Sequence, residues 1–159
     1  AESYLMEHTE HAELPLIPIT LDFIAHQLDV QQNGILAEYG ITSRQSKILL
    51  FLLHNQEKPV YQKDIEAFFS MRSSTITSIM GYLEKGGFLM RSPCETDARA
   101  KRITVTQKGR DLRRVIAGLL YRQEAQVTRG MSPEETALLR RLLRRVSANL
   151  CEGPCGPRR

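Results

Sequence analysis

Residues 88–105 constrain the fold of this chain more than any other stretch of its sequence. Apolar and polar side chains alternate there on both sides of a polar loop, with Phe88 and Met90 before the loop and Ile103 and Val105 after it. Period-two alternation around a polar loop is typical of two paired antiparallel strands. The sequence therefore predicts a tight hairpin at this place in the chain.

Two helical patterns come directly before the hairpin. The first is apolar-patterned and runs from Val60 to Phe69, and the second begins near Arg72 and ends at Gly86-Gly87. Four apolar residues of the second pattern recur at i, i+3, i+4 and i+7 and should face the core: Ile76, Ile79, Met80 and Leu83. Its opposite face carries small polar residues and a glycine: Ser74, Thr75, Thr77, Ser78 and Gly81. Two short helices followed by a hairpin predict a helix-turn-helix with a wing.

The polar face of the second helix has the chemistry of a surface that binds a nucleic-acid duplex. Short hydroxyl side chains allow close approach to a groove wall, and each can donate to a phosphate or meet a base edge. The helix N-terminus adds its own backbone N–H groups. Arg72 is the one side chain at the head of this face that is suited to bidentate base contacts, so specificity should also rest on hydroxyl contacts, apolar contacts and DNA shape. An ordinary polar helix face is the alternative, and the neighbouring hairpin disfavours it.

Basic residues gather at or near the tip of the predicted hairpin. An arginine held on a rigid hairpin can enter a minor groove, where the negative potential is strong. Asp97 lies two residues before Arg99 and is expected to orient that arginine or to brace the wing. The predicted DNA-binding residues are Arg72, Ser73, Ser74, Thr75, Thr77, Ser78, Arg91, Asp97, Arg99, Lys101 and Arg102.

Charge is distributed unevenly along the chain. Residues 1–40 contain seven acidic and no basic residues, residues 41–110 contain twelve basic and six acidic residues, and residues 111–159 contain ten basic and five acidic residues. A basic centre steers a protein toward phosphates, and an acidic arm discourages collapse onto the same polyanion. Scattered solvated charges are the alternative explanation.

Helical patterns also precede the winged segment. Proline should restrict the first regular helix to the residues after about Pro18, and Gly40 should end it. A new helix, capped by Thr42 or Ser43, should then run to about Asn55.

Two further helices are predicted after the hairpin. Thr106 should cap a long helix that Gly130 ends, and Ser132 followed by Pro133 and Glu135 is a strong start for the last helix. The first helix and the last two carry apolar stripes, which could pack on their own domain or on the same helices of a second copy. Because two-fold DNA sites favour a two-fold protein, we expect a homodimer.

The predicted fold class is mainly α (α+β), a winged helix-turn-helix with flanking N- and C-terminal dimerisation helices. The predicted organisation is an N-terminal arm and dimerisation helix (1–40), a winged helix-turn-helix DNA-binding domain (41–110), C-terminal dimerisation helices (111–150) and a disordered tail (151–159).

The composition excludes several other classes of protein. With 42% apolar and 25% charged residues, the chain can bury a core and is not wholly disordered. No apolar run reaches the roughly 18 residues of a membrane span. The first 40 residues contain no Lys or Arg of the kind that opens a secretory signal, so a cytoplasmic protein with no membrane partner is expected. The three cysteines are an odd number and do not suggest a disulfide framework.

Several segments together resemble the MarR (multiple antibiotic resistance regulator) family of winged helix-turn-helix transcription regulators. The most specific are Asp97-Ala98-Arg99 in the wing and Thr106-Gln107-Lys108-Gly109 after it, and the similarity covers about residues 15–150. The resemblance implies a homodimer with six helices, whose first and last two helices build the dimer interface and whose DNA is often released by small ligands or oxidants. It also places Ser74 to Ser78 in the recognition helix. Arg72 is a departure from the family, because a small polar cap is more usual there.

Candidate sensor residues carry weaker signals. Cys94 is predicted at the wing tip near Arg91, where a cation could favour the thiolate and oxidation could disturb DNA contact. An incidental exposed cysteine is the alternative. His26 and Tyr39 lie near the helix junction where relatives hold aromatic acids, and they are weak ligand-binding candidates. A histidine on an apolar helix is more often a satisfied core or interface residue.

Other reactive residues give no defined site. Cys151 and Cys155 could pair with each other or across a dimer, and His8 and His11 have a spacing that could hold a metal such as zinc. Solvated terminal segments explain all four more simply, so neither a metal nor a cofactor is expected. No catalytic residue is expected either, because a Cys94 nucleophile would need an oriented base.

These observations favour a homodimeric, sequence-specific DNA-binding transcription regulator, most simply a repressor that responds to a ligand or an oxidant. Its expected partners are double-stranded DNA with a pseudo-palindromic operator, a second copy of the chain and a small-molecule effector. A winged-helix protein–protein adaptor without DNA readout is the alternative, and the basic wing is what discriminates the two. A small cysteine-dependent enzyme is a remote third hypothesis.

Overall fold

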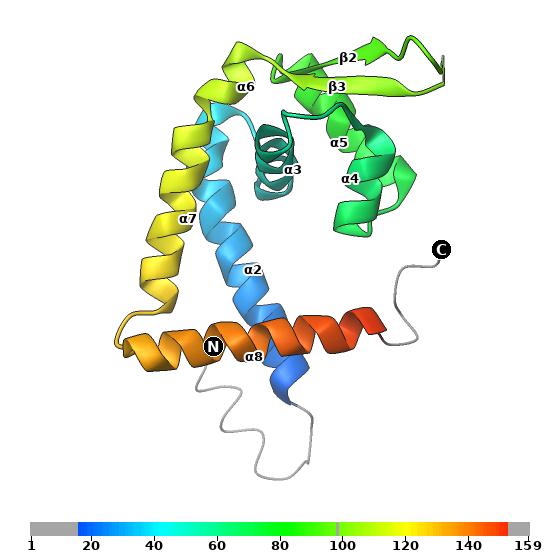
Figure 1. The fold of residues 1–159 in the computed structure, drawn as a ribbon. Helices are drawn as coiled ribbons and strands as arrows, with labels where there is room; N and C mark the ends of the chain where they lie inside the picture. The colour runs from blue at the N-terminus through cyan, green and yellow to red at the C-terminus, as the bar shows by residue number, and fades with distance from the viewer. Residues whose placement is uncertain (1–15, 98, 153–159) are drawn as a thin grey trace. The chain divides into compact units, whose positions relative to one another are not determined.

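The computed structural model describes residues 16–97 and 99–152 (Figure 1). Within them the chain is mostly helical, with one three-stranded antiparallel sheet, so the predicted fold class is confirmed. The chain divides into two compact units, residues 1–43 and residues 44–159, and each is described by itself.

The first unit contains one long helix, α2 (Leu16–Leu36), followed by a 3₁₀ turn, η1 (Ala37–Tyr39). Pro18 lies in the first turn of α2, where a backbone N–H has no helical partner, so the helix begins slightly before the predicted point. Gly40 ends the turn with a φ of 73°, a left-handed conformation that favours glycine, and its predicted role as the stop is confirmed.

The second unit begins with the winged segment and continues into two long helices. Its elements are α3 (Ser43–His54), β1 (Val60–Tyr61), α4 (Gln62–Phe69), α5 (Ser73–Lys85), β2 (Leu89–Pro93), β3 (Lys101–Val105), α6 (Gln107–Asp111), α7 (Arg113–Val127) and α8 (Pro133–Glu152). In Figure 1 the β2–β3 hairpin lies above α3, α4 and α5 and reaches out beyond them as the wing.

The core of the winged segment comes from the apolar faces of its helices and strands. The four α5 residues that the sequence assigned to the core are all buried: Ile76, Ile79, Met80 and Leu83. They are joined by buried residues of the other elements: Ile48 and Leu49 of α3, Ile65 of α4, and Leu89, Ile103 and Val105 of the hairpin. Burying this face leaves the polar face of α5 exposed.

The helix predicted from Val60 to Phe69 is wrong at its first two residues. Val60 and Tyr61 form strand β1, which pairs with Ile103 and Arg102 of β3. The carboxylate of Asp64 accepts a hydrogen bond from the Tyr61 N–H at 2.8 Å. This gives the backbone N–H of the residue before the helix a partner, and α4 starts at the next position. The hairpin is therefore part of a three-stranded sheet with the order β1-β3-β2.

The single long helix predicted after Thr106 is also wrong, because α6 and α7 are separate helices that meet at Leu112. The Leu112 N–H bonds to the Gly109 carbonyl, three residues back, which tightens the chain between them. The predicted capping role of Thr106 is confirmed, since its hydroxyl accepts from the Gly109 N–H at 3.2 Å.

The predicted start of the last helix is confirmed by a reciprocal capping box. The Ser132 N–H donates to the Glu135 carboxylate at 2.8 Å, and the Glu135 N–H donates to the Ser132 hydroxyl at 3.1 Å. Helix α8 continues through Cys151 to Glu152, two residues into the segment predicted as a tail, and the rest of that segment lies outside the described residues.

Over the described ranges, none of the helices combines the length and apolarity required to cross a membrane.

Candidate nucleic-acid interface

Helix α5 presents its hydroxyl residues to solvent at its N-terminal end. Ser73, Ser74, Thr77 and Ser78 are exposed, and Thr75 is half-buried. Arg72 occupies the N-cap position in an extended conformation, and its side chain makes no capping hydrogen bond. Its carbonyl accepts from the N–H groups of Thr75 and Ile76, so the helix starts at Ser73 and the arginine side chain is free to reach outward.

Gln62, the first residue of α4, connects the two helices of the helix-turn-helix. Its amide nitrogen donates to the Thr77 hydroxyl at 2.8 Å and to the Glu66 carboxylate at 2.9 Å, and it lies 3.4 Å from the Ser73 hydroxyl. The amide therefore holds two of the hydroxyl groups that the sequence assigned to DNA contact.

The tip of the wing is shaped by its own backbone. Cys94 N–H donates to the Ala100 carbonyl at 3.0 Å, and Ala100 N–H donates to the Asp97 carbonyl at 3.1 Å. The Asp97 carboxylate accepts from the backbone N–H of Arg99 at 2.9 Å. In the structure Asp97 thus braces the turn that carries Arg99.

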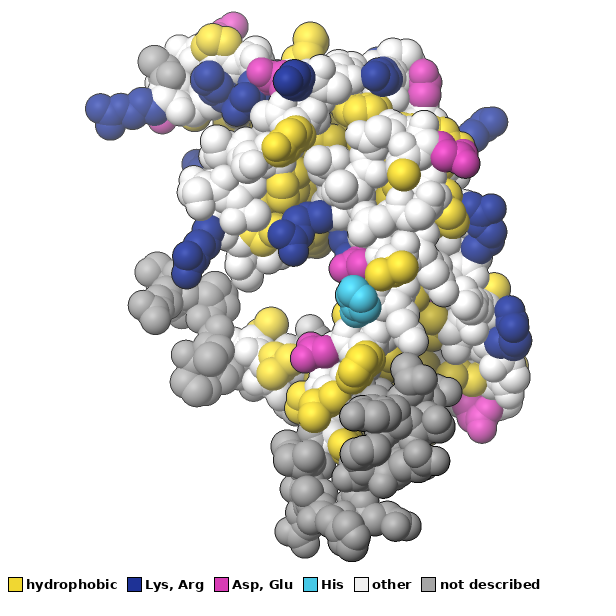
Figure 2. Space-filling view, turned by 180° about the vertical axis from the view of Figure 1, so that it is seen from behind, with side chains coloured by type: hydrophobic (Ala, Val, Ile, Leu, Met, Phe, Trp, Pro, Cys, Tyr) yellow, Lys and Arg dark blue, Asp and Glu magenta, His cyan; other side chains and the backbone are white. Residues whose placement is uncertain are grey.

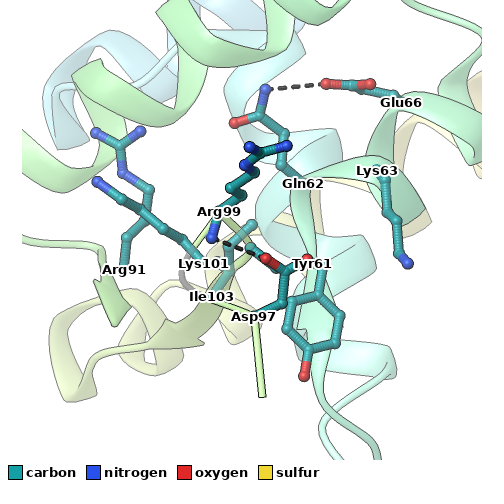
Figure 3. A pocket seen from close by; sticks show the side chains of 10 residues that line it. Tyr61, Gln62, Lys63, Glu66, Arg91, Asp97, Arg99, Lys101 and Ile103 are labelled. Carbon is teal, nitrogen blue, oxygen red and sulfur yellow. Dashed lines mark hydrogen bonds between the residues drawn. The ribbon is translucent and has the colours of Figure 1, made fainter. Parts of the chain in front are cut away.

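A hollow of about 450 Å³ lies between the wing and the start of α4, and we call it the wing hollow (Figure 3). It is lined by Tyr61, Gln62, Lys63, Glu66, Arg91, Asp97, Arg99, Ala100, Lys101 and Ile103. Figure 3 shows Arg91, Arg99 and Lys101 extending to the side on which Gln62 lies, whereas Lys63 and the Tyr61 hydroxyl point away. The space-filling view likewise has Lys and Arg side chains around the hairpin, at the upper left (Figure 2).

Arg91 does not belong to the tip where the sequence grouped it. It lies in the middle of β2, opposite Ile103, and its guanidinium pairs with the Glu84 carboxylate of α5 at 2.8 Å. The hydrogen bond between the two groups, and to a smaller extent the attraction of their charges, lowers the pKa of Glu84 and raises the pKa of Arg91. Arg91 therefore ties the wing to α5 as well as lining the hollow.

Arg102 is separated from the other wing cations. Successive residues of a strand point to opposite faces of the sheet, and Arg102 follows Lys101 in β3. Lys101 lines the wing hollow, whereas Arg102 lines two other hollows, one of them beside Cys94. The structure brings Arg91, Arg99 and Lys101 together and leaves Arg102 apart from them.

The base of the wing is held by the residues that follow β3. The Thr106 hydroxyl donates to the Gly87 carbonyl at 2.6 Å, and the Lys108 ammonium donates to the Gly86 carbonyl at 2.7 Å. The same ammonium lies 4.6 Å from the centre of the Phe88 ring. Gly109 packs so closely that an added Cβ would lie 2.3 Å from the Phe88 carbonyl oxygen. This gives a physical role to the Thr106–Gly109 motif, which closes the turn between α5 and the hairpin.

Cys94 lies at the start of the wing tip, and its thiol is polarised by neutral groups. Its sulfur is 3.2 Å from the Thr96 hydroxyl and 3.6 Å from the Tyr61 hydroxyl, and these hydrogen bonds lower the pKa of Cys94 to about 7. The same contact raises the pKa of Tyr61. Arg91, expected from the sequence to favour the thiolate, pairs with Glu84 instead.

The remaining predicted sensor residues belong to other elements than the wing. His26 is exposed on α2, Tyr39 is exposed in η1, and neither lines the wing hollow. Cys151 is exposed on α8. The other three candidates, His8, His11 and Cys155, lie outside the described residues.

Two residues of the interface were missed by sequence reasoning, Gln62 and Glu84. Each makes its important contact with a different element, Gln62 with α5 and Glu84 with β2. The sequence does contain a weak signal for the first, because Gln62 and Glu66 are four residues apart on one helix face. The sequence contains no such signal for Glu84, because its partner Arg91 lies beyond the turn between α5 and β2.

Comparison with known proteins gives a consistent group of relatives. Residues 39–100 match the model of the MarR family. The chain is 29% identical over 139 residues to the HTH-type transcriptional regulator PecS of Dickeya dadantii (strain 3937), covering 86% of this chain and 83% of PecS. The crystal structure of the transcription regulator MarR from Oenococcus oeni PSU-1 is 28% identical with a TM-score of 0.68, covering 83% of this chain and 98% of that one. The S. aureus MepR–DNA complex shares the fold, with a TM-score of 0.79, 22% identity, and coverage of 84% of this chain and 97% of that one.

Proposed function

Since this chain is a winged helix-turn-helix transcription regulator of the MarR family, we propose that it binds a pseudo-palindromic operator as a homodimer and represses transcription from it. Members of this family are regulators and not enzymes, which accords with the absence of any predicted catalytic residue.

The observation that carries the proposal is the grouping of three wing cations beside a hydroxyl-bearing helix. Arg91, Arg99 and Lys101 share the wing hollow, and Gln62, which lines the same hollow, bonds to Thr77 of α5. The helix face suits a major groove, and the exposed Arg99 and Lys101 suit the phosphates or the minor groove beside it. Arg91 is paired with Glu84 and holds the wing against α5. The MepR structure was solved with DNA, and it shares this fold.

Exposed apolar side chains on the long helices support a homodimer. On α8 they are Leu138, Leu142, Leu143 and Leu150, and on α2 they are Leu16, Ile17, Phe23, Ile24, Val30 and Ile35. A monomer that exposes this many large apolar side chains on its long helices is poorly soluble, so a second copy is their simplest cover. The dimer places two α5 helices in successive major grooves, one turn apart, with the wings reaching outward.

Release of the DNA by a small molecule or an oxidant is part of the proposal. Cys94 is the residue that an oxidant would reach, because its lowered pKa leaves a large thiolate fraction near neutral pH. His26 and Tyr39 stay the candidates for contact with a small molecule. The test is DNA binding before and after treatment with peroxide, with Cys94→Ser as the control that should not respond.

The test of DNA readout is fluorescence-anisotropy binding to duplexes selected by the protein from a randomised pool, repeated over a salt series. A regulator of this kind should bind a subset tightly and lose affinity steeply as salt rises. A protein–protein adaptor would bind weakly, without regard to sequence or salt, and that result would remove the proposal.

A further inference from the structure

The contact between Gln62 and Thr77 has a direction that determines what the recognition helix can offer to DNA. Glu66 fixes that direction, because a carboxylate only accepts hydrogen bonds and so must face the amide nitrogen of Gln62. The same nitrogen lies 2.8 Å from the Thr77 hydroxyl oxygen. The amide therefore donates to Thr77, and Thr77 accepts.

A hydroxyl that accepts from one partner keeps its own hydrogen for another. Thr77 is exposed on the polar face of α5, so its O–H is left to donate to a group outside the protein. Acceptors at a DNA surface are phosphate oxygens, purine N7, guanine O6 and thymine O4, whereas the exocyclic amines of adenine and cytosine are donors. A hydroxyl held in this way discriminates between the two kinds of group.

We propose that Gln62 is a positioning residue for DNA recognition, which holds the Thr77 hydroxyl as a hydrogen-bond donor toward an acceptor on the DNA. The inference rests on the proposed DNA binding and deepens it. Gln62 does not itself have to touch the duplex. It acts from the neighbouring helix, at the edge of the wing hollow, where α4 and α5 are joined.

The test begins with a duplex that the wild-type protein selects from a randomised pool. Gln62→Met keeps the length of the side chain and removes its polarity, and Thr77→Val keeps the shape and removes the hydroxyl. Each should weaken binding about threefold to tenfold, the range for one lost hydrogen bond. The double variant should bind no more weakly than Thr77→Val, because both changes remove the same contact.

Gln107 provides a matched control. It is also the first residue of its helix and also bonds to an acid four residues on, Asp111. Its partners Asp111 and Arg110 lie in α6 itself, whereas Gln62 also bonds to Thr77 of a second helix. Gln107→Met should bind the selected duplex like the wild type. The melting temperature of the Gln62→Met protein should equal that of the Gln107→Met protein. Equal melting temperatures show that loss of binding does not come from unfolding.

A charge-neutral exchange reverses the direction of the bond. Gln62→Glu combined with Glu66→Gln keeps the net charge and the pairing within α4, but the carboxylate at position 62 would accept from Thr77 and turn its hydrogen inward. This variant should lose as much affinity for the selected duplex as Thr77→Val does. Both losses should arise at the same base pair or phosphate. Its salt dependence should equal that of the wild type, because no cation is lost.

Provided that the wild type still selects and binds its duplex, any of three results would overturn the inference. The first is normal affinity of Gln62→Met, and the second is a double variant whose loss of affinity is the product of the two single losses. The third is that Gln62→Met and Thr77→Val change the base preference at different positions of the duplex. A wild-type protein that selects no duplex overturns the proposed function itself, and the inference with it.

Discussion

Arg99 and Arg102 are three residues apart in the sequence but line different hollows of the wing. Arg99 shares its hollow with Arg91 and Lys101, and it stands on a turn whose backbone Asp97 braces. Counting the cations that are close in the sequence therefore gives too many, because Arg102 does not lie with the others. The separation is testable because both side chains are exposed and carry the same charge.

We expect Arg99→Ala to weaken DNA binding on all duplexes and to lower the salt slope of log K by about 1, because one phosphate or minor-groove contact is lost. Anisotropy titrations over a salt series measure both quantities. Arg102→Ala is the control and should change the slope less.

Arg72→Ala should behave differently from both, because its side chain stands at the head of α5 without a capping role. It should change which duplexes are selected as well as how tightly they bind. Equal losses on every sequence for Arg72→Ala and Arg99→Ala would contradict this division of roles.

The reactivity of Cys94 should depend on pH near neutrality. Its pKa is lowered to about 7, first by the hydrogen bond to Thr96 and then by that to Tyr61, so the thiolate predominates above that pH and is lost below it. In a background that lacks Cys151 and Cys155, the rate of iodoacetamide alkylation should rise with a midpoint near that pKa.

Thr96→Val and Tyr61→Phe should each move the alkylation midpoint upward, because each removes a hydrogen bond to the thiolate. The chain unfolded in urea supplies the reference. A folded protein with the same midpoint as the unfolded chain would show that these contacts do not stabilise the charged form.

At the scale of the element, α6 is the short helix on which the geometry of the wing depends. Gly109→Ala should destabilise the protein by about 2 kcal/mol or more, because the new methyl group meets backbone in a packed site. The contacts are the Phe88 carbonyl oxygen at 2.3 Å and Val105 Cγ1 at 2.6 Å. Urea unfolding followed by circular dichroism measures the change.

Gly118 on α7 is the matched control for this substitution. A Cβ there meets nothing within 4 Å, so Gly118→Ala should stabilise the protein by up to about 1 kcal/mol through helix propensity. Destabilisation of similar size at both glycines would point to a general effect of substitution and not to the close contact at Gly109.

The sequence predicted those elements whose signal lies within the element. Helix α5 and the hairpin have clear periods, and the caps at Thr106 and Ser132 depend on residues three positions away. Strand β1 was missed because two residues have no period, and Val60 is equally compatible with a helix. The break at Leu112 was missed because the apolar stripe continues across it while the backbone tightens.

The sequence predicted which residues belong to the candidate site better than it predicted how they are arranged. The hydroxyl face of α5 follows from the apolar face opposite to it, so it could be derived from spacing alone. Pairing of Arg91 with Glu84 depends on how the turn at Gly86-Gly87 folds the hairpin over α5, and no local pattern contains that information.

At the scale of the whole molecule, the oligomeric state is the property that most needs measurement. Leu142→Glu places a charge on the apolar face of α8 and should shift the protein from dimer to monomer, because that face would no longer exclude water. Light scattering after size exclusion gives the mass, and DNA affinity should fall with it. Arg144→Glu changes the charge on the opposite face of α8 and should leave the dimer intact.

The anchoring of the hairpin has a consequence for how related proteins diverge. Lys108 and Thr106 fasten the base of the wing to the turn after α5. The tip is held mainly within itself, by backbone hydrogen bonds and by the Asp97 carboxylate, with one contact from Cys94 to Tyr61 of β1. Insertions, deletions and exchanges between Cys94 and Ala100 therefore leave in place the contacts that hold the base of the wing against α5. The wing tip is the place where this architecture can acquire a new DNA preference in few mutational steps, and a tip grafted from a relative should fold on this scaffold.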